Sequence, residues 1–145
     1  MNRFTILSVL LIAFSASAWA QETIGFVKTV SGDALLIDAG KYVIAKVGAP
    51  VKSGNVLKTG ANGTMGVTFK DNTVMSFGPD TELTLDEYLY APGKGDLKFG
   101  ASMSKGTLQV VSGVIARLKP ESAVLKTPAG IIAMRNAHFL VKIDQ

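Results

Sequence analysis

The chain has 145 residues and a formal net charge of +4, with no cysteine and a single histidine. The absence of cysteine excludes disulfides, thiol nucleophiles and thiolate metal sites, so stability has to come from a packed core. The basic residues are scattered rather than gathered into a stripe, which argues against a nucleic-acid partner.

The first twenty residues have the pattern of a secretory signal peptide. Arg3 gives a positive start, an apolar run covers residues 4–14, and small residues follow. Ala18 and Ala20 supply the small side chains that signal peptidase requires, so we expect cleavage before Gln21. The apolar run is shorter than the roughly 20 residues that span a bilayer. The sequence therefore predicts an exported domain of residues 21–145, periplasmic or alternatively secreted, without a transmembrane segment in the mature chain.

Beyond residue 21 the pattern is that of one all-β domain. Apolar alternation is broken by turns rich in Gly, Asn and Asp at intervals of roughly eight to ten residues. A helical turn or two is expected only at 112–118, where Gly113 and Pro120 limit its length. Residues 91–96 predict an exposed loop. The expected strands are 23–30, 34–38, 42–47, 56–59, 65–69, 73–77, 83–85, 97–103, 106–111, 122–127, 130–134 and 138–143.

Several motifs follow one another in a fixed order. A Gly-x-Val core opens the first strand, and a Gly-Asp-x-apolar-x-Thr-Gly element with two later turns corresponds to residues 54–83. A Lys-Gly-x-apolar strand and a Thr-Pro motif ending in Arg-Gly-Thr correspond to residues 105–108 and 127–137. In order and spacing the chain resembles the FecR domain family of the bacterial periplasm. The chain departs from the family pattern at three places. Asn55 stands where the family has Asp and Asn72 where it has Gly, and Asn136-Ala137 replace the Gly-Thr of the closing motif.

The resemblance covers nearly all of residues 21–145 and implies a rolled or solenoid-like all-β fold, with a β-sandwich as the alternative. Family members that regulate iron uptake join this domain to a membrane helix and a sigma-factor-binding segment. The sequence shows neither segment, so we expect a stand-alone module that does not itself carry a signal across a membrane.

The inventory of reactive residues argues against an enzyme. His138 has no second histidine or cysteine with which to build a metal or nucleophile site. Asp86 and Glu87 are adjacent, so on a regular strand they face opposite sides, and Asp80 and Glu82 flank a turn. We therefore do not expect a hydrolase built on these carboxylates. We expect no catalytic residue, no metal and no cofactor.

Two groups of residues are candidates for recognition. Thr127, Pro128 and Arg135 match the closing family motif, and the Arg135 guanidinium suits either an internal clamp or a partner's carboxylate. Tyr88 and Tyr90 precede the Pro/Gly loop, where aromatic residues belong either to a recognition patch or to the core.

The leading hypothesis is a non-enzymatic exported binding or adaptor module, accessory to signalling, whose partner is an envelope protein or a glycan. The alternative is a structural component of an envelope or surface assembly, in which an open sheet edge such as the C-terminal strand self-associates by β-strand addition.

Overall fold

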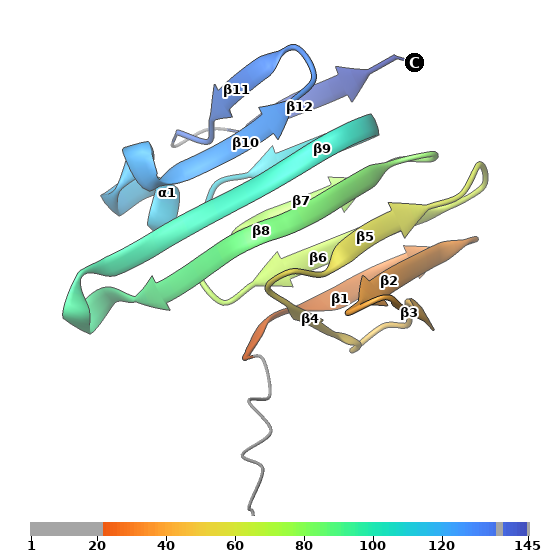
Figure 1. Ribbon diagram of the computed structural model, residues 1–145, viewed down its shortest axis with the longest axis horizontal. Coiled ribbons are helices and arrows are strands. Elements are labelled where there is room, and N and C mark those ends of the chain that lie inside the picture. The colour runs from red at the N-terminus through yellow and green to blue at the C-terminus, as the bar shows by residue number, and fades with distance from the viewer. Residues whose placement is uncertain (1–21, 136–137, 145) are drawn as a thin grey trace, which may run out of the picture.

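A computed structural model describes residues 22–135 and 138–144 (Figure 1). Within these residues twelve strands join into one sheet, which confirms the all-β expectation. The predicted cleavage residues Ala18, Ala20 and Gln21 lie outside the described residues, as do Asn136 and Ala137. In the described ranges there is no helix with the length and apolar character needed to cross a membrane.

The expected strands are present, although the strand expected at 83–85 is much longer and the strand expected at 42–47 ends before residue 47. In chain order they are β1 (Thr23–Ser31), β2 (Ala34–Asp38), β3 (Lys41–Ile44), β4 (Pro50–Lys52), β5 (Val56–Thr59), β6 (Thr64–Phe69), β7 (Val74–Phe77), β8 (Glu82–Ala91), η1 (Pro92–Lys94), β9 (Asp96–Val111), α1 (Val114–Leu118), η2 (Pro120–Ser122), β10 (Ala123–Thr127), β11 (Gly130–Ala133) and β12 (His138–Ile143). β4 was not expected, because its three residues lie between two glycine-containing turns.

The sheet is rolled, as the resemblance implied. Its main path runs β3-β2-β5-β8-β9-β7-β6-β1-β4, and every pairing on that path is antiparallel. The two halves of the path face each other, since Phe69 of β6 packs edge-on against Phe99 of β9 with ring centroids 5.0 Å apart. Figure 1 shows β8 and β5 in front of β7 and β6, with β9 common to both halves.

β9 is the strand on which the sheet turns. Its first part pairs with β8 and its last part, from Leu108, pairs with β7. Gly106, at φ +102°, lies between the two parts, and a Cβ there would stand 2.2 Å from Thr81 Oγ1. The sequence predicted two strands here, 97–103 and 106–111. That prediction was wrong, because the glycine bends one continuous strand instead of ending it.

The core lies between the two facing halves. Met65, Val67 and Phe69 of β6 are all buried, as their alternation predicted. On β12 Val141 is buried, with 9% of it exposed, while Leu140 is 67% exposed, again following the predicted alternation. The chain closes with a crossover, in which the five-residue α1 leads into β10 and β10 pairs in parallel with β9.

Candidate functional site

Four strands of the described chain, β3, β4, β11 and β12, pair with a single neighbour and are therefore sheet edges. β3 follows β2 through a two-residue turn, in which Ala39 and Gly40 have φ of +48° and +81°. Two successive positive φ values are typical of the tight turn that suits a β-hairpin. This turn sets the register in which Asp38 pairs with Lys41 and Leu36 with Val43.

Among these edges β3 exposes the most large hydrophobic side chains. Tyr42 is 74% exposed and Ile44 is 73% exposed. Both lie on the outer face of the sheet, because they pair with Ile37 and Leu35, whereas Val43 pairs with buried Leu36. Natural proteins usually protect an edge with charge, proline or a bulge. We call the outer-face residues Leu35, Ile37, Tyr42, Ile44 and Val56 the β3 face.

The backbone of β3 is also open on one side. Ala45 N–H donates to Ala34 O at 3.0 Å, which fixes the phase of the ladder between β2 and β3. In an antiparallel pair, hydrogen-bonded and non-hydrogen-bonded positions alternate. Counting back from Ala45, the peptide groups of Val43 face β2, and those of Tyr42 and Ile44 face the open edge.

A hollow of about 110 Å³ lies between β3 and β4, at the two ends of the rolled path. Its lining is largely apolar, with an ion pair between Asp38 and Lys52 at 3.6 Å. The lining residues are Leu36, Asp38, Val43, Ala49, Pro50, Lys52 and Asn55. The hollow thus opens beside the unpaired edge of β3.

Asn55 is the unusual member of this lining. Only 2% of it is exposed, and its Oδ1 accepts a hydrogen bond from Lys52 N–H at 2.9 Å. That bond fixes the orientation of the amide, since the backbone nitrogen requires an acceptor. Asn55 Nδ2 is then left as the buried side-chain polar atom without a partner among the described residues. A buried donor without an acceptor costs roughly 1–3 kcal/mol.

A second buried polar group, Asp71, has the opposite character. Its side chain is fully buried in the turn between β6 and β7. Oδ1 accepts from Tyr88 Oη at 2.9 Å and from Thr73 N–H at 3.3 Å. Oδ2 accepts from Thr73 Oγ1 at 2.8 Å and from Ile115 N–H at 3.2 Å. Asp71 therefore ties the β6–β7 turn to β8 and to α1.

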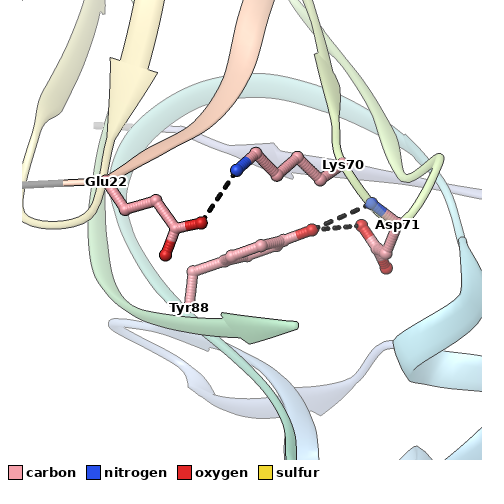
Figure 2. Close-up of polar contacts among 4 residues, drawn as sticks. All are labelled: Glu22, Lys70, Asp71 and Tyr88. Atoms are coloured by element: carbon pink, nitrogen blue, oxygen red, sulfur yellow. Dashed lines mark hydrogen bonds and ion pairs between the residues drawn. The ribbon is translucent and has the colours of Figure 1, made fainter. Parts of the chain in front are cut away.

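Tyr88 completes this network (Figure 2). Its hydroxyl donates to the Asp71 carboxylate and accepts from Asp71 N–H at 3.0 Å, while the ring lies near the Lys70–Glu22 ion pair. Burial raises the pKa of Tyr88 well above its ordinary value, and the negative charge of Asp71 raises it further. The hydroxyl thus remains protonated and acts as a structural donor.

A β-bulge explains why Tyr88 points inward. Leu85 pairs with Ala101 and Glu87 with Gly100, so Asp86 is the extra residue of β8. The bulge leaves both Asp86 and Glu87 exposed, with Asp86 bonded to Ser102 and Glu87 paired with Lys98. The expectation that the two carboxylates face opposite sides was wrong, because it assumed regular alternation.

The predicted recognition residues lie apart from β3. Tyr88 and Tyr90 are partly buried against the core, and Leu89 between them is 47% exposed. Thr127 Oγ1 donates to Gly130 O at 2.9 Å across the β10–β11 turn, where Pro128 is exposed. The Arg135 side chain is exposed, and within residues 22–135 and 138–144 it forms no recorded ion pair.

His138 lies exposed on β12 and contacts the side chain of Gln109. The described part of the chain contains no group of three or more His, Cys, Asp or Glu that could hold a metal ion. Sequence reasoning missed Asn55, Asp71 and the β3 face as sites. For Asn55 a signal was present, because it stands where the family motif has aspartate.

Comparison with known proteins gives one family. A family model described as FecR protein matches residues 55–145, which include Asn55 and every strand from β5 onward. Neither a curated protein nor a solved structure matches the chain. β1 to β4, and with them the apolar edge, precede the matched residues.

Proposed function

The chain belongs to the FecR family, and from this premise we propose that it is an exported, non-enzymatic adaptor of the bacterial envelope that binds another envelope protein through the β3 face. Membership supports a periplasmic, signalling-related role. The single observation that carries the proposal is the exposure of Tyr42 and Ile44 on an unpaired edge strand.

The β3 face has the composition of a protein-binding surface. An antiparallel sheet with one solvated side normally carries polar residues on that side. Here Tyr42 and Ile44 are joined on the same side by half-buried Leu35, Ile37 and Val56. Large contiguous apolar patches on monomers mark interaction sites. The chemistry suits an apolar protein surface better than a polyhydroxylated glycan.

Photo-crosslinking in the native host tests this function. A photoreactive phenylalanine analogue replaces Tyr42 in tagged protein, and Lys94 in the exposed η1 turn serves as the matched control position. We expect one discrete protein adduct from position 42 and none from position 94. The adduct should disappear when Ile44→Ser is added. Equal labelling from both positions, or no adduct from position 42, contradicts the proposal.

A second candidate, a structural assembly joined by strand addition, is favoured by β12. This strand pairs only with β9 in the described chain, and its Leu140 is 67% exposed. Sedimentation velocity of purified residues 21–145 over a hundredfold concentration range separates the two candidates. An adaptor remains monomeric, whereas an assembly grows with concentration and loses that growth in Leu140→Lys.

A further inference from the structure

The hollow between β3 and β4 combines three features that a single kind of occupant satisfies. They are an open strand edge, an apolar recess of about 110 Å³ and the unpartnered Nδ2 of buried Asn55. We propose that an extended segment of the partner protein adds as a strand to β3, places one aliphatic side chain in the hollow, and accepts a hydrogen bond from Asn55 Nδ2. This inference rests on the proposed function and specifies its binding mode.

The backbone supplies the first part of the recognition. The peptide groups of Tyr42 and Ile44 face away from β2 and have no ladder partner on the open side among residues 22–135 and 138–144. An added strand would pair with these groups and extend the sheet by one strand. Main-chain bonds of this kind give affinity, and side-chain pockets give specificity.

The hollow supplies the specificity. Its volume exceeds the roughly 30 Å³ that a water molecule occupies in the liquid, so it has room for a branched aliphatic side chain. Leu36, Val43 and Pro50 would contact that side chain from both halves of the sheet. Burying such a side chain against apolar walls favours binding and offsets part of the cost of association.

Asn55 indicates that the occupant carries an oxygen at this point. Asn55 is one of the residues that line the hollow, its Nδ2 is buried without a partner among the described residues, and the other polar lining residues, Asp38 and Lys52, pair with each other. A backbone carbonyl of the added strand is an acceptor of the required kind. Pairing it with Nδ2 removes the cost of the buried orphan donor, which an occupant with only apolar atoms leaves in place.

Charge indicates what flanks the occupant's apolar residues. Lys41 and Lys46 lie at either end of the exposed segment, and neither forms an ion pair within the described residues. A partner segment with acidic residues at its ends would meet both ammonium groups. The other end of the rolled path is less suitable, because Pro50 on β4 has no N–H to donate.

The test uses a capped seven-residue peptide of alternating valine and threonine with a glutamate at each end. The control peptide has proline at the centre, which removes a ladder donor. We expect the first peptide to shift the backbone amide signals of β3 and the side-chain amide signals of Asn55 in ¹⁵N-labelled protein. The proline peptide should leave them unchanged.

Variants of the protein sharpen the result. Asn55→Asp keeps the acceptor for Lys52 N–H but lacks the donor, so its affinity for the peptide should fall about tenfold. Ile44→Pro removes an edge N–H that does not face β2 and should weaken binding by a similar factor, while Ile44→Val should stay within about twofold. Urea denaturation of each variant checks that it folds.

The outcomes separate this inference from the function beneath it. Peptide shifts on β11 or β12 in place of β3, or equal binding of the proline peptide, overturn the strand-addition mode. If position 42 still crosslinks a partner protein in cells, the adaptor function stands and only the mode fails. Concentration-dependent shifts on β3 without peptide would assign the edge to a second copy of the chain and likewise overturn the proposal.

Discussion

The buried side chains of Asp71 and Asn55 differ in how completely their polar atoms are hydrogen-bonded. Asp71 accepts four hydrogen bonds, from Tyr88, Ile115 and two groups of Thr73, and joins three elements. Asn55 accepts a hydrogen bond through its oxygen, but its Nδ2 has no partner in the part of the chain that the structure describes. A saturated network stabilises the fold, whereas an unsaturated donor next to a hollow is suited to a ligand.

The largest loss of stability is expected from Asp71→Ala. The substitution leaves the Tyr88 hydroxyl and the backbone N–H of Ile115 buried without their acceptor, so the free energy of unfolding should fall by at least about 3 kcal/mol. Urea denaturation measures it. The control is Asp96→Ala at an exposed site, with an expected change within about 0.5 kcal/mol. Equal losses in both variants would mean that the network carries no particular weight.

Exchanging acid and amide at the two sites gives the next largest effect. Asp71→Asn places an amide N–H₂ among donors, and we expect a loss of about 2 kcal/mol. Asn55→Asp keeps the acceptor for Lys52 N–H, and we expect a loss below about 1 kcal/mol. Chemical denaturation of the pair measures the asymmetry. A larger loss at position 55 than at position 71 would reverse the assignment of roles.

Tyr88→Phe keeps the ring packed against Phe69 and Phe99 but removes the hydroxyl, so it should cost about 1 kcal/mol at neutral pH. The pKa of Tyr88 is raised in the folded protein. As the pH rises above about 10, the Tyr88 hydroxyl therefore ionises in the unfolded state before it does so in the folded state. The contribution of the hydroxyl is therefore fully present below about pH 10 and declines progressively as the pH rises further towards the raised pKa of the folded state. The stability advantage of the unmodified protein over Tyr88→Phe should shrink as the pH rises above about 10; an advantage that grows there would contradict the network.

The smallest effect on stability is expected from Tyr42→Ser. The side chain is mostly exposed and contributes little to the core, so the free energy of unfolding should change by less than about 0.5 kcal/mol. The same variant should lose its partner in cells. Calorimetry of the purified variant measures the change in the free energy of unfolding. A marked loss of stability would mean that the β3 face serves the fold and is not free for binding.

Much of the fold could be predicted from alternation and turn residues. The strands at 34–38, 56–59 and 138–143 have the predicted bounds, and residues typical of turns flank the first two. Alternation did not predict the positions at which a strand bends or carries a bulge. Gly106 bends β9 without ending it, and the bulge at Asp86 turns Tyr88 inward. Neither depends on a local pattern, since both depend on which strands face each other.

The candidate site was less predictable for the same reason. Asn55 was visible as a departure from a motif, but its missing partner depends on the approach of β3 to β4 at the ends of the path. Residues singled out by the motif, such as Thr127 and Arg135, lie on the distant β10–β11 hairpin and the segment after it. A role for them in binding remains a separate prediction.

Whether the β3 edge is open and accepts a strand is tested most directly by amide hydrogen exchange, resolved residue by residue with and without the valine-threonine peptide. In the free protein we expect strong protection of Ile115 N–H and fast exchange of Tyr42 and Ile44 N–H at the open edge. Saturating peptide should slow Tyr42 and Ile44 by at least about tenfold and leave Ile115 unchanged. Tyr42 and Ile44 amides that are already protected in the free protein, or that are unaffected by the peptide, would contradict an open edge that accepts a strand.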